Sequence, residues 1–146
     1  MKIAIASDHA GFELKQAVVA YLDGKADILD LGTNSLESVD YPDFGFAMGN
    51  AIAEGKVSLG ILICGSGIGI SIAANRNPKV RAALCTSAEM AKLSRQHNNA
   101  NVLALGARII DTKTALECVD AFLNTPFEGG RHDKRVQKLG NCNVSS

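Results

Sequence analysis

Five short apolar segments alternate with segments of helical periodicity, and this alternation constrains the fold more than any other feature of the sequence. The apolar segments are residues 2–6, 26–32, 59–64, 81–85 and 101–106. The helical segments are residues 11–24, 44–54, 69–76, 87–97 and 112–124, with one apolar face wherever the 3.6-residue period is clear. Strands that are joined through helices run parallel. The pattern therefore predicts an α/β fold with helices on both faces of one parallel sheet.

Length and composition are those of a single globular domain spanning residues 1–146, with 47% hydrophobic residues. Lys plus Arg and Asp plus Glu both number 15, so charge gives no sign of nucleic acid or membrane as a partner. The first apolar run is too short for a secretory signal, and the four cysteines form no CxxC pair. We therefore expect a cytoplasmic protein with reduced thiols.

Polar side chains are expected where ligands bind in parallel sheets, beyond the carboxyl ends of the strands. The candidates, each following a strand or the fourth helix, are Asp8, His9, Cys64, His97, Asn98 and Arg108. We expect all of them at one rim of the sheet, the pattern of an active site. Asp8, His9 and His97 show no local metal-ligand spacing, so no metal is expected.

A glycine loop, GSGIG at residues 65–69, joins the third strand to the next helix. Its glycines permit a tight turn, and successive N–H groups beside a helix N-terminus attract an anion. The spacing matches neither the dinucleotide fingerprint nor the Walker loop. Two interpretations remain open at this point, a tight strand-to-helix turn and a cradle for an oxyanion.

Cys64 stands at the mouth of the glycine loop. Free cysteines are commonly buried as small hydrophobic groups, which accounts for Cys85 and Cys118. Backbone donors and a helix N-terminus next to Cys64 instead favour a reactive thiolate. The position predicts a nucleophile or a general base, and His9 or His97 could accept the proton of a nucleophilic thiol.

The C-terminal arm (residues 127–140) is polar, basic and helical after Gly130. Arg131, Arg135 and Lys138 recur at helical spacing. Judged by charge alone, a solvated terminal helix is favoured over an anion-binding arm that reaches a partner subunit.

Seven stretches of sequence occur in order from Ser7 to Val136. They are SDHAGFELK, DLGT, DYPD, GILICGSGIGISIAANR, RAALC, LSRQHNNANVLALGAR and EGGRHDKRV. Together they resemble the sugar-phosphate isomerase family that includes type B ribose-5-phosphate isomerase, galactose-6-phosphate isomerase and allose-6-phosphate isomerase. The resemblance implies a three-layer, Rossmann-like α/β/α sandwich with a five-stranded sheet in the order 2-1-3-5-4. It also implies an enzyme without metal or cofactor, assembled as a homodimer or tetramer with active sites at the subunit interface.

The resemblance further implies interconversion of aldose and ketose phosphates through a cis-enediolate. Cys64 would be the general base, because the glutamate used in another branch of the family would stand at Ile70. Ser66 would relay a proton near the two reacting oxygens. The enediolate would be held by the loop residues Gly65, Ser66, Gly67, Ile68 and Gly69.

The remaining roles implied by the resemblance concern ring opening and phosphate binding. His97 would protonate the ring oxygen of the sugar, with Asp8 as its helper. Further substrate contacts would be His9, Tyr41, Asn98, Arg108, Arg131 and Arg135. The two arginines of the arm would bind phosphate from the partner subunit, which reverses the interpretation based on charge alone.

Ribose 5-phosphate and ribulose 5-phosphate are the expected substrates. The alternatives are allose 6-phosphate, galactose 6-phosphate or a free aldose, and, less favoured, a non-catalytic sugar-phosphate-binding protein. A thiol hydrolase would leave Arg131 and Arg135 without a role. Cys64, His97 and both arginines occur in one chain, which favours a homo-oligomer that needs no second type of subunit. The expected location is the cytoplasm.

Overall fold

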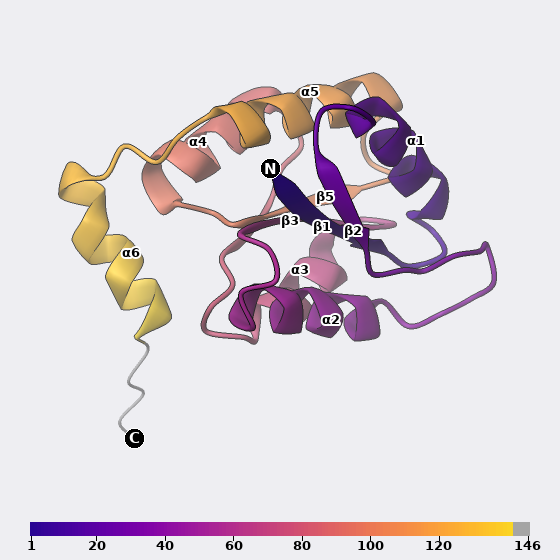
Figure 1. Ribbon diagram of the computed structural model, residues 1–146, viewed down its shortest axis with the longest axis horizontal. Helices are drawn as coiled ribbons and strands as arrows, with labels where there is room; N and C mark the ends of the chain where they lie inside the picture. The colour runs from indigo at the N-terminus through magenta and orange to yellow at the C-terminus, as the bar shows by residue number, and fades with distance from the viewer. Residues whose placement is uncertain (142–146) are drawn as a thin grey trace.

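The computed structural model describes residues 1–141, in which a five-stranded parallel sheet lies between two layers of helices (Figure 1). The strands are β1 (Lys2–Ser7), β2 (Asp27–Asp30), β3 (Leu59–Cys64), β4 (Ala82–Leu84) and β5 (Val102–Gly106). Their order is β2-β1-β3-β5-β4, and every neighbouring pair is parallel. The predicted three-layer fold and strand order are confirmed.

Helices cover both faces of the sheet. Figure 1 shows α1 (Phe12–Leu22), α4 (Ala88–Asn98) and α5 (Thr112–Asn124) on one face, and α2 (Tyr41–Ala53) and α3 (Ile68–Asn75) on the other. Because each helix returns the chain from one strand to the start of the next, the helices run opposite to the strands. Among the described residues, no helix is long and apolar enough to cross a membrane.

Alternating side chains of the strands supply two separate cores. Ile61 and Ile63 of β3 pack with α1, α4 and α5, whereas Leu62 and Cys64 pack with α2 and α3. Covering on both faces explains why the strands read as continuous apolar runs rather than as alternating ones. The same alternation places the Cys64 side chain on the α2 and α3 side of the sheet.

The main difference from the predicted boundaries concerns α2, which begins at Tyr41 rather than at Phe44. Asp40 is extended, with φ −92° and ψ 118°, and Pro42 occupies the first turn. Proline fits there because the first N–H groups of a helix have no partner within the helix. The earlier start carries Tyr41 on the first turn of α2 instead of in a loop.

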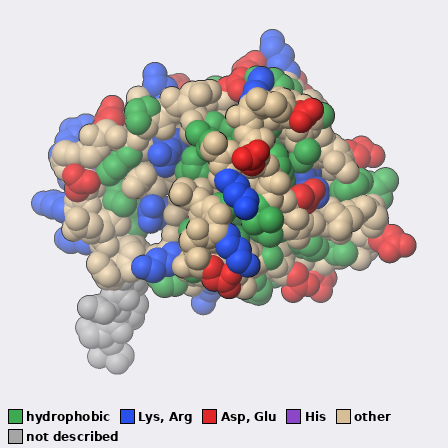
Figure 2. Space-filling view, in the orientation of Figure 1, with side chains coloured by type: hydrophobic (Ala, Val, Ile, Leu, Met, Phe, Trp, Pro, Cys, Tyr) green, Lys and Arg blue, Asp and Glu red, His purple; other side chains and the backbone are tan. Residues whose placement is uncertain are grey.

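The C-terminal arm lies beside the layers rather than within them (Figure 1). It contains a 3-10 turn at Gly130–His132 followed by α6 (Asp133–Gly140), so the predicted helix after Gly130 is confirmed. No residue of α6 is buried, and Leu139 is 57% exposed. Figure 2 shows Lys and Arg side chains gathered at this end of the molecule.

Candidate active site

A cavity of about 590 Å³ lies where β1, β3 and β5 end, and we call it the carboxyl-edge cavity. Eight of the predicted residues line it together: Asp8, Tyr41, Cys64, Gly65, Ser66, Ile68, Gly69 and Arg108. Their meeting follows from topology, because parallel strands bring their carboxyl ends to one edge. Ile72 and Ile109 add an apolar wall that the sequence analysis missed.

The glycine loop is wedged against β5. Gly67 has φ +78°, in the left-handed region that side chains with a β-carbon rarely adopt. A β-carbon at Gly67 would lie 2.8 Å from the carbonyl carbon of Leu105 and 2.9 Å from its oxygen. The loop therefore requires glycine here for both its conformation and its packing. Helix α3 begins at Ile68, so its positive N-terminal end borders the cavity.

The loop fixes the sulfur of Cys64. The Gly67 N–H donates a hydrogen bond to Cys64 Sγ over 3.2 Å, and Cys64 is 4% exposed. Next to it, the Ile68 N–H donates to Ser66 Oγ over 3.1 Å. A buried thiol and a hydroxyl thus both accept hydrogen bonds from backbone N–H groups of the same loop.

Two groups from neighbouring strands flank the thiol. Asp8 is buried, and its Oδ1 accepts a hydrogen bond from the Gly11 N–H over 3.1 Å. The Arg108 N–H donates to the Gly65 carbonyl over 2.9 Å, and its guanidinium lies along Gly65, where a β-carbon would be 3.2 Å from Nη1. A carboxyl group and a fixed positive charge therefore border the cavity from opposite sides of β3.

Two further predicted residues surround this centre. The Tyr41 ring packs on Gly69, where a β-carbon would overlap it. His9 Nδ1 accepts a hydrogen bond from the Val39 N–H over 3.1 Å. A neutral His9 therefore carries its proton on Nε2, which leaves that nitrogen as a donor for an anion.

His97 and Asn98 do not join this rim, and the expectation that they would is wrong within one chain. Both lie at the end of α4, which runs opposite to the strands and leads into the start of β5 at Val102. Helix ends and strand ends meet at opposite edges of a parallel sheet. Asn98 instead borders a separate cavity of about 420 Å³, together with Arg81 and Leu139.

At that amino edge, His97 belongs to a group that we call the imidazole cluster, made of His97, Glu128 and His132. The rings of His97 and His132 are stacked, with centroids 4.5 Å apart and planes 16° from parallel. Glu128 Oε1 lies 3.8 Å from His97 Nε2 and 3.7 Å from His132 Nε2. Loss of solvent lowers the pKa of His132, and the nearby His97 and Arg131 lower it further.

The sequence analysis assigned no role to Glu128 or His132. Their spacing of four residues within EGGRH was the available signal, because such a spacing brings two side chains together on a helical turn. Their contact with His97 could not be predicted from this spacing, because it depends on a hydrogen bond between distant segments. The Glu128 N–H donates to the Gln96 carbonyl over 3.1 Å, which joins the arm to α4.

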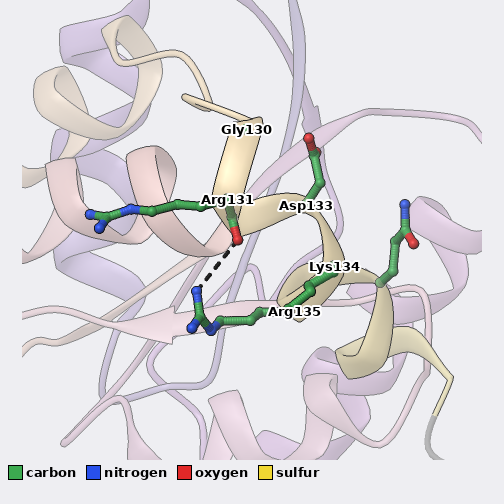
Figure 3. A pocket seen from close by; sticks show the side chains of 6 residues that line it. Gly130, Arg131, Asp133, Lys134 and Arg135 are labelled. Carbon is green, nitrogen blue, oxygen red and sulfur yellow. Dashed lines mark hydrogen bonds between the residues drawn. The ribbon is translucent and has the colours of Figure 1, made fainter.

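Arg131 and Arg135 extend toward the same side of the C-terminal arm, while Asp133 points elsewhere (Figure 3). Arg135 Nη1 donates to the Arg131 carbonyl over 3.4 Å. The two side chains border a pocket of about 490 Å³ formed by the arm alone. Neither of them lines the carboxyl-edge cavity in the same chain.

Residues 3–139 match the sequence profile of the family described as Ribose/Galactose Isomerase. The chain belongs to this family. Among its relatives, the ribose-5-phosphate isomerase B of Escherichia coli (strain K12) is 48% identical, over 94% of this chain and 93% of the relative.

Solved structures of ribose/galactose isomerases share both the fold and much of the sequence. The ribose-5-phosphate isomerase B of Clostridium thermocellum matches with a TM-score of 0.95 and 50% identity, over 97% of this chain and 96% of the other. The Mycoplasma genitalium enzyme, solved with bound ribulose-5-phosphate, matches with a TM-score of 0.92 and 43% identity, over 96% and 94% of the two chains.

Proposed function

We propose that this chain is an aldose-ketose isomerase that interconverts ribose 5-phosphate and ribulose 5-phosphate through a cis-enediolate. The observation that carries the proposal is the buried Cys64 thiol, held by the Gly67 N–H at the mouth of an anion-binding loop. Ile70, at the position of the alternative carboxylate base, is fully buried and has no group that accepts a proton. The relative with bound ribulose-5-phosphate supports this choice of substrate.

The proposed reaction moves one proton between neighbouring carbons. The Cys64 thiolate takes the proton from C2 of the open-chain aldose, and the resulting thiol returns it to C1 of the enediolate. Ser66 passes a proton between the oxygens on C1 and C2. Because a proton on a sugar carbon is weakly acidic, the developing oxyanion needs donors. Those N–H groups of residues 65–69 that are not bonded to Cys64 Sγ or Ser66 Oγ would supply them.

Ring opening precedes this step and is assigned to His97 with the help of Asp8. In one chain, however, His97 lies at the amino edge of the sheet and Cys64 at the carboxyl edge. Both groups act on the same small sugar, so we infer that His97 is supplied by a second copy of this chain. Arg131 and Arg135 lie on the C-terminal arm, which packs beside His97 on α4, and they would bind the phosphate there.

This arrangement requires a homodimer whose two active sites lie at the subunit interface. A tetramer formed from two such dimers would leave the sites unchanged. A cytoplasmic location is part of the proposal, because Cys64 must stay a reduced thiol to act as a base, and Cys64, Cys85 and Cys118 are all free.

The first experiment compares isomerisation of ribose 5-phosphate by the unmodified protein, Cys64→Ala and the matched thiol control Cys118→Ala. Cys118 is buried in α5, on the other face of the sheet. We expect kcat to fall about 10²–10⁴-fold in Cys64→Ala alone, because only that variant loses the base. An unmodified protein that converts only allose 6-phosphate or galactose 6-phosphate would contradict the proposed substrate. Full activity in Cys64→Ala would contradict the proposed base.

The second experiment mixes two inactive variants, Cys64→Ala and His97→Gln, after reversible dissociation. If the two groups come from different subunits, each mixed dimer carries one intact site and one site with both changes. Random pairing then restores about one quarter of the unmodified activity. A mixture that stays inactive, although mixed dimers are detected by mass spectrometry, would show that one chain supplies both groups.

A further inference from the structure

The imidazole cluster contains two possible metal ligands, Glu128 and His132, that the proposed isomerisation does not use. One nitrogen from each of His97 and His132 and one oxygen of Glu128 all lie within 4.8 Å of one another. Two imidazole nitrogens and one carboxylate oxygen form the donor set that borderline divalent ions such as Zn²⁺ prefer, whereas Mg²⁺ and Ca²⁺ prefer oxygen alone.

Two backbone hydrogen bonds help to bring the three side chains together. The Glu128 N–H donates to the Gln96 carbonyl over 3.1 Å, which sets the carboxylate beside His97. The His132 N–H donates to the Gly129 carbonyl over 3.1 Å and closes the turn that returns His132 toward Glu128. The ring stacking then places the two imidazoles side by side.

The distances suit a metal ion once the two imidazole side chains change rotamer. A tetrahedral ion with ligands at about 2.0–2.1 Å separates its donor atoms by about 3.3 Å. The two contacts to Glu128 Oε1 are 3.8 Å and 3.7 Å, so the carboxylate oxygen is less than 1 Å from ligand spacing. The two imidazole rings must turn out of their stacked arrangement so that a nitrogen of each faces the same ion. His97 and Glu128 are partly exposed, which leaves room for water to complete the coordination. The carboxylate also offsets the positive charge of the neighbouring Arg131 and Arg135.

We propose that His97, Glu128 and His132 form a binding site for a borderline divalent transition-metal ion such as Zn²⁺. The ion occupies the nitrogen of His97 that would otherwise exchange a proton with the sugar, so it acts as an inhibitor and not as a cofactor. The binding site stands on the geometry alone, whereas the inhibition rests on the role proposed for His97.

Binding is tested without substrate, by titrating the full chain with ZnCl₂ in a calorimeter and with CoCl₂ in a visible-absorption cell. We expect one ion per chain. His132→Ala and Glu128→Gln should each weaken the affinity at least about 100-fold, because the loss of even an outer contact costs 10–100-fold. Both residues lie on the arm, and far-UV circular dichroism checks that the fold is kept.

Two control variants separate this site from other ligands of zinc. Cys64→Ala and His9→Gln remove the thiol and the imidazole nearest the carboxyl-edge cavity, and both should bind Zn²⁺ as the unmodified protein does. Binding that survives in His132→Ala and Glu128→Gln, or that disappears in Cys64→Ala, would overturn the proposed site. The absence of any binding in the unmodified protein would do the same.

Inhibition is then measured on ribose 5-phosphate. Zn²⁺ should reduce turnover by the unmodified protein at the concentration at which it binds, and a chelator should reverse the loss. The residual turnover of His132→Ala should be insensitive to the same concentration. Binding of one ion without inhibition would support the site and overturn the role of His97, so the two failures are distinguishable.

Discussion

The carboxyl-edge cavity and the C-terminal arm carry groups proposed for one reaction, but the chain builds them in different ways. Cys64 ends a central strand, is 4% exposed and is held by a loop that packs on β5. The arm has no buried residue in α6, and Leu139 is 57% exposed. The comparison teaches that the proposed proton-transfer centre is preorganised by the core, whereas the groups proposed to bind phosphate lie on an arm that its own chain barely covers.

The comparison is tested most strongly by adding a methyl group to one glycine in each region. Gly67 and Gly130 both have positive φ, +78° and +58°. Gly67→Ala adds a clash with Leu105 to the backbone strain, so we expect a loss of several kcal/mol, about 3 or more, and of nearly all activity. Gly130→Ala meets nothing within 4 Å and should cost only about 1 kcal/mol. Urea unfolding and kcat measure both effects, and equal losses in the two variants would refute the contrast.

Removing the two guanidinium groups of the arm should affect substrate binding and leave the fold intact. For Arg131→Ala combined with Arg135→Ala, we expect KM for ribose 5-phosphate to rise about 100-fold, since two charge-assisted contacts are lost at 1.5 kcal/mol or so each. Lys134→Ala is the matched control on the same helix. Turnover of unphosphorylated ribose should not change, and a parallel loss on ribose would rule out a phosphate-specific role.

A smaller effect is expected from Ser66, whose hydroxyl accepts a hydrogen bond from the Ile68 N–H at the mouth of the loop. Ser66→Ala should lower kcat about tenfold to 100-fold, because a proton relay assists a base that is still present. Ser71→Ala is the control, since that hydroxyl donates to the Ile68 carbonyl within the same helix. Comparable losses in both variants would indicate a change in the loop rather than the loss of a relay.

The smallest expected effect is electrostatic and concerns His132. Loss of solvent, followed by the nearby His97 and Arg131, holds its pKa below the ordinary value of 6.5. The unfolded chain therefore binds a proton on His132 at pH values where the folded chain does not. The contact of the arm with α4 should weaken as pH falls below 6.5 toward the lowered pKa, and it should be unaffected above 6.5. An NMR titration measures this pKa directly, and His97→Gln should raise it; no change in that variant would refute the coupling.

Most of the fold could be predicted because buried positions carry apolar residues, and the spacing of those residues along the sequence indicates strands and helices. The strand Leu59–Cys64 and the helix Thr112–Asn124 have the predicted bounds. The start of α2 was placed three residues late because DYPD has the composition of a loop. Pro42 is compatible with a first helical turn, but nothing local distinguishes that turn from a loop.

The candidate site also has a part that the sequence predicts and a part that it does not. Asp8, Cys64 and Arg108 follow strand ends, so topology alone predicts that they meet. His97 lies in the last turn of α4. The helices run opposite to the strands, so helix ends and strand ends lie at opposite edges of the sheet, and the order of residues along the sequence does not show this directly. The contact of Glu128 and His132 with His97 depends on one backbone hydrogen bond between distant segments, for which the sequence carries no periodic signal.

The glycine loop also limits how the enzyme can be redesigned for longer or shorter sugars. Side chains at positions 67 and 69 would overlap Leu105 and Tyr41, so these two positions are closed to variation. Ile68, Ile72 and Ile109 line the cavity and are each more than half exposed. A combinatorial library aimed at a new substrate should therefore vary the few residues of the cavity wall. Substitutions at these two loop glycines would instead give unfolded variants.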